Sequence, residues 1–283
     1  MIRRIYVPLT GAEGDLAALA AAFTTAAHVG AHVDAALLRF DQRYARPKLS
    51  EPLPPGLFEE IATLLSDHDA AEARARLHFD DARAAVGAPL AEAPPGPGGL
   101  SARWLGLRPA ERIVRDGRLA DLLVVGPTTA REIPRANAIR RAALVTAGRP
   151  LLLAPAAGPK TIGKRIAVAW NGNAGGAQAV AAALPFLAKA DEVHVLTAVT
   201  DKTRSSEGDR LVDYLLWHGI AATPHVLRHA DSVADLLLAT AGGLAADLLV
   251  MGGYVQSRLQ ELLLGGVTSY VFSHARLAIL VAR

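Results

Sequence analysis

The sequence predicts an α/β protein built from two tandem, doubly wound domains, each with a five-stranded parallel sheet. Three observations support this fold class. The chain repeats itself, short apolar runs alternate with Ala- and Leu-rich helical segments, and 283 residues suit two domains of about 150 residues. Such alternation indicates a parallel sheet with helices on both faces, whose buried strands need no polar residue at every second position.

The repeat begins with a short apolar run that ends at a glycine. Residues Arg4–Gly11 (RIYVPLTG) align with Arg165–Gly172 (RIAVAWNG). In both copies a helical segment and a second apolar strand follow. We expect the two helices at residues 16–28 and 178–190, and the two strands at 33–38 and 193–199.

The later part of each copy is equally similar. Residues 120–126 (ADLLVVG) match residues 246–252 (ADLLVMG). Each copy then closes with a uniformly apolar strand, at 151–154 in the first copy and at 279–282 in the second. As free edges these strands would favour aggregation, so pairing them with each other is physically sensible.

Domain boundaries follow from the join between the copies. The Pro/Gly-containing stretch at 156–159 suits a linker, so we expect domains at 1–156 and 163–283. The extra length of the first domain lies between about residues 41 and 109. It includes the run 93–99 (APPGPGG), which cannot continue a helix or a central strand and is expected to be an exposed loop.

Composition excludes several classes of protein. The formal charge is +3 with both signs interspersed, and no basic run suggests nucleic-acid binding. No cysteine is present, which excludes disulfides, Cys-based zinc sites and thiol catalysis. The N-terminal apolar run is too short for a signal peptide, and the Ala-rich stretch 16–27 is too short for a membrane span. We therefore expect a cytoplasmic protein without membrane contact.

A glycine-bearing segment near the C-terminus is the strongest functional signal. In Val250–Thr268 (VMGGYVQSRLQELLLGGVT) a buried strand ends in Gly252-Gly253, and Gly265-Gly266 opens a helix. Glycines let backbone N–H groups approach an anion, and the dipole of a helix N-terminus favours negative charge. Ligands of open parallel sheets lie beyond the carboxyl ends of the strands. Taken alone, the glycines fit tight turns without a ligand equally well.

This segment resembles the universal stress protein family, in which a strand ending in Gly-x2-Gly-x9-Gly-(Ser/Thr) binds ATP. The four motif positions fall in this chain on Gly252, Val255, Gly265 and Gly266. The preceding ADLLVMG run, the closing strand and Val168–Gly172 (VAWNG) are also similar to that family, the last to one bacterial tandem branch. The resemblance covers nearly all of 163–283 and, more loosely, 1–156.

The resemblance implies an adenine nucleotide α-hydrolase-like fold, with the two domains related by a pseudo-twofold and packed edge strand to edge strand. It implies ATP or AMP in the C-terminal domain only. Asn171 and Val199 would flank the base, and the helix start at Gly266 would face the phosphates. The residues expected to line the site are Ala169, Asn171, Val199, Met251, Gly252, Val255, Ser257, Arg258, Gly265, Gly266, Val267 and Thr268.

Three departures from the family pattern affect this site. Val255 replaces the second motif glycine, and a β-branched residue resists positive φ, so the loop is expected to be reshaped or narrowed. Gly266 replaces the Ser/Thr, which removes a hydroxyl and keeps the N–H. Asn171 stands where the family commonly has Asp, and its amide can both donate and accept.

The first copy departs further from the family. Pro127 follows the strand and removes one backbone donor, no glycine pair precedes the next helix, and Thr10 occupies the Asp position. We expect no nucleotide site of this type in residues 1–156.

Three other patterns give weaker signals. Residues 158–165 (GPKTIGKR) imitate a P-loop, but Arg165 replaces the required Ser/Thr and a strand follows. His218, His225 and His229 lack a tight metal-ligand spacing. The acids at 207, 209 and 213 fit a solvated helix face.

Two functions stay open, a nucleotide-sensing stress-response regulator and an interaction or scaffold protein with a decayed pocket. A slow ATP hydrolase ranks last because no residue of the segment is an obvious base for water. Protein partners, a homodimer and the inducing stress stay open.

Overall fold

The described part of the N-terminal half forms five strands, four of which lie where the repeat predicts them; the strand at Ser101–Pro109 falls within the stretch 41–109 that the sequence marked only as extra length. The computed structural model describes residues 1–39, 68–92, 99–110, 112–127, 139, 142–199, 206–228, 232–253 and 266–283. The elements of this half are β1 (Arg4–Leu9), α1 (Gly14–Val29), β2 (His32–Arg39), α3 (His68–Ala85), β3 (Ser101–Pro109), α4 (Arg112–Gly117), β4 (Leu122–Val125), the π-helix η2 (Ala142–Ala147) and β5 (Leu151–Leu153).

The C-terminal half repeats this succession of strands and helices. Its elements are β6 (Arg165–Ala169), α6 (Ala174–Leu187), β7 (Glu192–Ala198), α7 (Glu207–Trp217), β8 (Thr223–Leu227), α8 (Val233–Gly243), β9 (Leu248–Gly252), α9 (Gly266–His274) and β10 (Ala278–Ala282). Helix α6 begins at Ala174 rather than at the expected Gln178, because the Asn173 side chain caps it by accepting from the N–H of Gly176 at 2.7 Å. The expected loop at 93–99 lies almost entirely outside the described residues.

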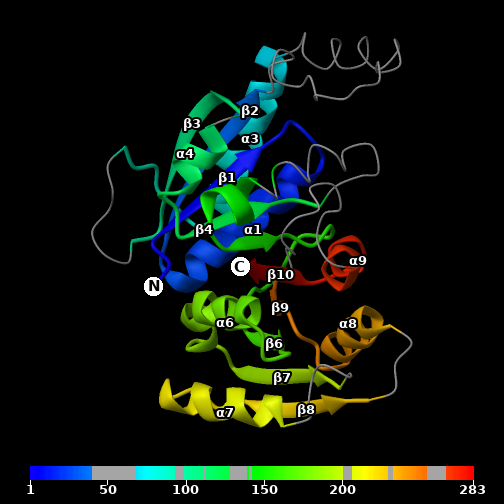
Figure 1. Ribbon diagram of the computed structural model, residues 1–283. Coiled ribbons are helices and arrows are strands. Elements are labelled where there is room, and N and C mark those ends of the chain that lie inside the picture. Colours follow the sequence, from blue (N-terminus) through cyan, green and yellow to red (C-terminus); the bar gives the residue numbers. More distant parts are fainter. Residues whose placement is uncertain are drawn as a thin grey trace, which may run out of the picture.

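The ten strands of the described residues belong to one sheet, in the order β3-β2-β1-β4-β5-β10-β9-β6-β7-β8. Pairing is parallel within each half, and the two halves join through the antiparallel pair β5 and β10. Each half alone has the order of a doubly wound five-stranded sheet, and the antiparallel seam relates the halves by a pseudo-twofold. The predicted α/β fold class and the predicted edge pairing are confirmed (Figure 1). The expectation of two separate sheets is wrong, because pairing of β5 with β10 joins them into one continuous sheet.

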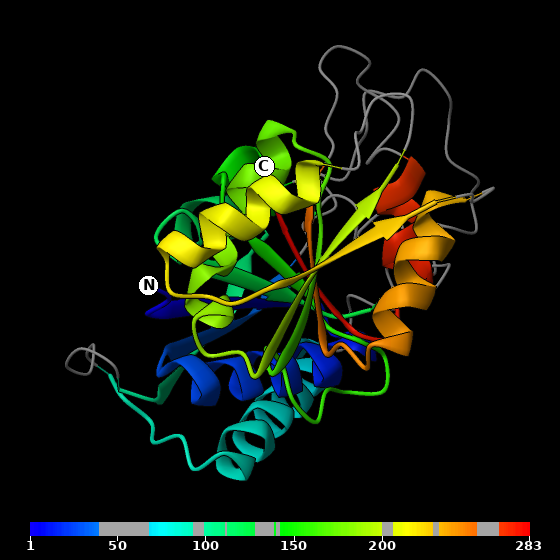
Figure 2. The ribbon, with the colours of Figure 1, turned by 90° about the horizontal axis from the view of Figure 1, so that it is seen from below.

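Helices cover both faces of the twisted sheet (Figure 2). Buried residues of α1, α3, α6 and α7 contribute to the apolar core on one face. Residues of α4, η2, α8 and α9 contribute to the core on the other face. Each core contains residues of both halves, so the hydrophobic contacts run across the seam instead of ending at it.

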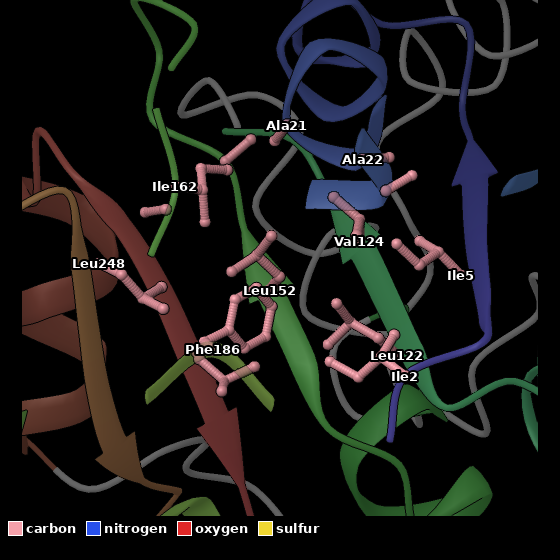
Figure 3. Packing of buried hydrophobic residues seen from close by; sticks show 14 of the residues in the cluster. Ile2, Ile5, Ala21, Ala22, Leu122, Val124, Leu152, Ile162, Phe186 and Leu248 are labelled. Atoms are coloured by element: carbon pink, nitrogen blue, oxygen red, sulfur yellow. The ribbon is translucent and has the colours of Figure 1, made fainter. Parts of the chain in front are cut away.

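The seam itself is apolar. Leu152 on β5 is fully buried and pairs with Leu280 on β10. Ile162, just before β6, and Phe186 on α6 are buried in the same cluster beside residues of the N-terminal half (Figure 3). Burial of these side chains holds the two halves together without a ligand.

A histidine of the N-terminal half also reaches the seam. The carbonyl oxygen of His28, near the end of α1, accepts a hydrogen bond from Nζ of Lys189 at 2.8 Å. Nε2 of His28 is buried and has no partner in the described part of the chain. Burial, followed by the charges of Lys189 and Lys164, lowers the pKa of His28 below its ordinary value.

Candidate functional site

The carboxyl ends of β6, β7 and β9 meet where the strand order of the C-terminal half reverses. β6 lies between β9 and β7, and Ala169 is opposite Met251 on one side and Leu196 on the other. Such a reversal in an open parallel sheet creates a crevice outside the strand ends. The structure therefore brings together three predicted site residues, Ala169, Met251 and Gly252.

The two residues expected to flank a base lie at the same edge. Asn171 is exposed two residues beyond β6, and its Oδ1 accepts from the N–H of Asn173 at 3.3 Å. Val199 follows β7 directly, is half-buried, and donates its N–H to the carbonyl of Leu227 at 2.9 Å. Both positions are compatible with the expected contacts.

Gly252 has a structural role that the motif did not reveal. A Cβ added to Gly252 would lie 2.6 Å from the nitrogen of Gly176 and 2.7 Å from the carbonyl carbon of Gly175. The end of β9 therefore packs directly on the first turn of α6. In the N-terminal half a Cβ on Gly126 would meet the carbonyl of Gly14 in the same way. Close helix packing explains this glycine in both halves, whether or not a ligand binds.

The loop after the first strand differs between the halves. In the N-terminal half the carboxylate of Asp15 is buried and accepts from the N–H groups of Thr10 at 2.9 Å and Gly11 at 2.7 Å. The repeat places Gly176, which has no side chain, at the position of Asp15. The N-terminal half thus fills this loop with the carboxylate of Asp15, and the matching position in the C-terminal half carries no side chain for the loop at Asn171.

The glycine segment itself is only partly described. Val255, Ser257, Arg258 and Gly265 lie outside the described residues. Helix α9 begins at Gly266, as the motif predicts, and Val267 and Thr268 lie in its first turn. The phosphate contacts expected of these residues stay predictions.

One carboxylate expected to face solvent instead approaches the site. Glu207, the first residue of α7, has a half-buried side chain, and a Cβ on Gly172 would lie 2.7 Å from its Oε2. The sequence could not show this contact, because it depends on how α7 docks against the loop after β6. The sequence showed only that Glu207 lies at the start of a predicted helix and that Gly172 follows a predicted strand.

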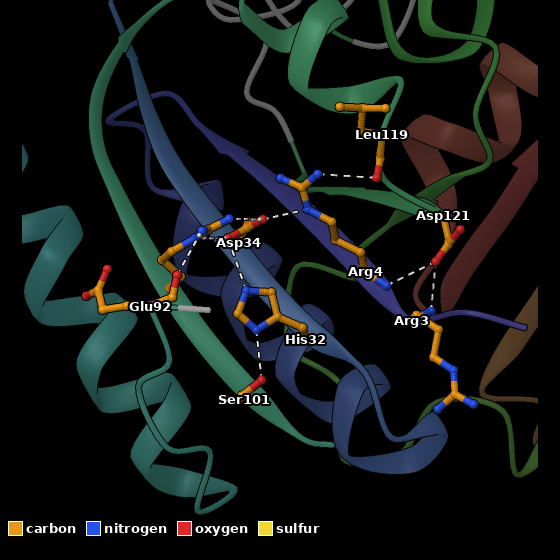
Figure 4. A network of polar contacts seen from close by, with 9 residues as sticks. Arg3, Arg4, His32, Asp34, Glu92, Ser101, Leu119 and Asp121 are labelled. Atoms are coloured by element: carbon orange, nitrogen blue, oxygen red, sulfur yellow. Dashed lines mark hydrogen bonds and ion pairs between the residues drawn. The ribbon is translucent and has the colours of Figure 1, made fainter. Parts of the chain in front are cut away.

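A second polar cluster, in the N-terminal half, resembles a hydrolytic triad. Nδ1 of His32 lies 2.8 Å from the Ser101 hydroxyl, and its Nε2 lies 3.1 Å from Oδ1 of Asp34 (Figure 4). Asp34 also accepts from Nε of Arg4 at 2.6 Å and from Nε of Arg103 at 2.9 Å.

This cluster is structural. Ser101 is 1% exposed and Asp34 is 0% exposed, so no substrate reaches the hydroxyl. Burial alone would raise the pKa of Asp34, but hydrogen bonds from His32 and Arg103 and the Arg4 charge lower it well below the ordinary value. The carboxylate stays ionised and ties β1, β2 and β3 together.

The described residues contain no group of three or more metal-ligating side chains placed to hold a metal ion. His225 lies 3.2 Å from His194, whereas His229 falls outside the described residues. Among the described helices none has the length and apolar character needed to cross a membrane.

Comparison with known families decides what the C-terminal half is. The sequence model of the Universal stress protein family matches residues 163–283. Residues 163–283 form a universal stress protein domain. No curated protein matches the chain in sequence.

Solved structures extend the fold of the universal stress protein domain to the whole chain. A universal stress protein from Archaeoglobus fulgidus DSM 4304 is 11% identical with a TM-score of 0.63, and the match covers 99% of this chain and 98% of that one. A functionally unknown protein from Pseudomonas aeruginosa PAO1 is 16% identical with a TM-score of 0.59, covering 99% and 92%.

The cytoplasmic domain of a prokaryotic cation chloride cotransporter has the same fold at 12% identity, with a TM-score of 0.50, covering 100% and 96%. The fold of the whole chain therefore occurs in proteins with different names, and function has to be argued from the site of the universal stress protein domain.

Proposed function

We propose that the chain is a stress-response regulator whose C-terminal universal stress protein domain binds an adenine nucleotide, ATP or AMP. One observation carries the proposal. At the switch point of the C-terminal half, the loop at Asn171 lacks the internal carboxylate that Asp15 supplies to the matching loop of the N-terminal half. A loop whose N–H groups have no carboxylate to donate to at the matching position, at the carboxyl ends of parallel strands and with a helix beginning at Gly266 beyond β9, suits a ligand with acceptor groups.

The nucleotide would lie across the ends of three strands. Asn171 and Val199 would contact the base, Ala169, Met251 and Gly252 would underlie the ribose, and the N–H groups around Gly266 would face the phosphates. Nothing in this arrangement requires hydrolysis, so binding itself would be the signal. The N-terminal half would bind no nucleotide and would act in the cytoplasm as a fixed partner of the sensing half.

Isothermal titration of the full-length protein with ATP and with AMP tests the proposal. We expect binding of both, with little advantage for ATP, because Val255 replaces the motif glycine and a β-branched residue there would misplace donors meant for the outer phosphates. Gly266→Leu should abolish binding by filling the space in front of the helix. No binding to the wild-type protein would contradict the proposal.

Restoring the motif residue tests the outer phosphates separately. Val255→Gly should raise the affinity for ATP by roughly tenfold to a hundredfold, the effect of one hydrogen bond to a charged group, and raise the affinity for AMP less. Equal gains for both nucleotides would show that residue 255 does not face the outer phosphates.

An interaction module is the second candidate function, and the surface of α7 favours it. Trp217 is 91% exposed, and Leu216 and Tyr214 beside it are also exposed. Contiguous exposed apolar side chains often mark protein contacts. If neither nucleotide binds, this helix is the surface to examine by substituting Trp217 with a polar residue and measuring partner capture.

A further inference from the structure

Two facing histidines lie at the edge of the sheet in the C-terminal half. Among the described strands β8 is the last in the order and pairs only with β7 (Figure 1). His194 on β7 and His225 on β8 have ring centroids 5.2 Å apart, and Nδ1 of His194 is 3.2 Å from Nε2 of His225. The two nitrogens are therefore on the facing edges of the rings. His194 is the third residue of β7, so it is set back from the carboxyl end that borders the candidate nucleotide site.

The spacing of the two nitrogens suits ligands of one metal ion. Zn–N bonds to histidine are about 2.0–2.1 Å long, so two nitrogens that bind one ion at an angle of about 100–110° are about 3.1–3.4 Å apart. The observed separation of 3.2 Å lies in that range. His225 is half-buried on the edge strand, so an ion and its water ligands have access from solvent. A direct hydrogen bond between the rings has the same length, and the surroundings have to decide between the two.

A carboxylate orients the buried member of the pair. Nε2 of His194 is 3.4 Å from Oε2 of Glu192, and Oε1 of Glu192 is 3.0 Å from a guanidinium nitrogen of Arg165. An imidazole that donates one N–H to a carboxylate keeps the lone pair of its other nitrogen. Here that nitrogen is Nδ1, which faces His225. Metal-binding histidines almost always have such an outer partner, which fixes the tautomer and increases the basicity of the ligand.

The N-terminal half has a different cluster at the corresponding place. The pairing of the second strand with the first puts Asp34 at the position of His194. There the carboxylate forms ion pairs with Arg4 and Arg103 from the two neighbouring strands. In the C-terminal half β8 contributes His225 instead. The fold therefore accepts a closed ion-pair network at this place, and the facing imidazoles are a feature of the C-terminal half alone.

We propose that His194 and His225 bind a late transition-metal ion such as Zn²⁺, which ties the edge strand β8 to β7. Imidazole nitrogens suit zinc, copper and nickel, whereas Mg²⁺ and Ca²⁺ prefer oxygen ligands. Within the described residues no third metal-ligating side chain completes the set, so water fills the other coordination positions. Glu192 is a positioning residue that holds His194 without contacting the ion. This site is separate from the proposed nucleotide site and does not depend on it.

Isothermal titration of the full-length, metal-free protein with zinc chloride tests the proposal. We expect saturable binding of one ion per chain and no competition by Mg²⁺. His225→Ala should weaken zinc binding by at least the roughly tenfold to hundredfold that loss of an outer partner costs. Zinc should also raise the Tm of the wild type, because it binds the folded state, and should not raise the Tm of His225→Ala. The Tm of the metal-free variant shows directly that it is folded.

His218→Ala is the matched control, because His218 is an exposed histidine at the end of α7 and its removal also leaves eight of the nine histidines. This variant should bind zinc as the wild type does. No saturable binding by the wild type would overturn the proposal. Equal losses in His218→Ala and His225→Ala would also overturn it, because zinc would then be held by scattered surface histidines.

Glu192→Gln tests the positioning role. Zinc affinity should fall by about tenfold, because the outer carboxylate is lost. The visible absorption spectrum of bound Co²⁺ should keep its shape, because both ligand nitrogens remain. A spectrum changed by Glu192→Gln would show that the carboxylate is itself a ligand, and an unchanged zinc affinity would show that it does not orient His194.

Discussion

Replacing Gly252 with Ala tests whether this motif glycine serves packing, independently of any ligand. The new methyl group would lie 2.6 Å from the nitrogen of Gly176, whereas ordinary contact begins at 3.4 Å. The end of β9 and the first turn of α6 would therefore have to separate by about 0.8 Å. Neither side can relieve the contact by turning a side chain, because both groups are backbone.

The expected destabilisation is about 2–3 kcal/mol, the upper part of the range for overpacking a well-packed interior. For a chain of 283 residues this corresponds to a fall of roughly 3–6 °C in Tm. Gly126→Ala should have a similar effect, because its Cβ would meet the Gly14 carbonyl in the half without the predicted site.

Thermal unfolding of ligand-free protein, followed by circular dichroism, is the assay. Gly242→Ala is the control, since Gly242 lies in α8 and its Cβ would meet nothing within 4 Å. That variant should be unchanged or more stable by up to about 1 kcal/mol. If Gly252→Ala is as stable as the wild type and only its affinity for nucleotide is reduced, the packing argument is wrong.

Three further predictions concern the fold and its pH dependence. Asp34→Asn should lower the free energy of unfolding by about 3 kcal/mol at pH 7 in urea titrations, because Arg4 and Arg103 lose their buried charged partner. The difference from the wild type should shrink below about pH 4, because protonation of Asp34 then removes the stability that its lowered pKa provides. A difference that stays constant with pH would contradict this. Because the pKa of His28 is lowered in the folded state, the unfolded state binds more protons just below about pH 6.5, and the Tm of the wild type should rise with pH in that range. His28→Gln should flatten this rise. If the dependence of Tm on pH is the same in both proteins, His28 is not its cause. Leu152→Ala should cost about 2–5 kcal/mol at the seam, and independent melting of two halves in the wild-type protein would show that the shared core does not couple them.

The sequence alone located four strands in each half and their grouping, whereas the edge strands β3 and β8 were placed only by the structure. Apolar runs such as those at 151–154 and 279–282 are local patterns, and a strand buried on both faces shows itself in a few consecutive residues. The internal repeat then assigned the strands to two groups, and the uniformly apolar closing strands predicted the seam between β5 and β10. The strand ends that carry Ala169 and Met251 were predicted for the same reason.

The tertiary structure decided what the individual side chains do. Glu207 is 35 residues from Gly172 in sequence, and only the docking of α7 brings its carboxylate there. Asp34 reads as one charged residue in an apolar strand until its arginine partners from β1 and β3 are seen. The sequence likewise did not show that Gly252 packs against the first turn of α6. Periodicity encodes which face of an element is buried, but contacts between elements depend on distances across the sheet, which no local pattern specifies.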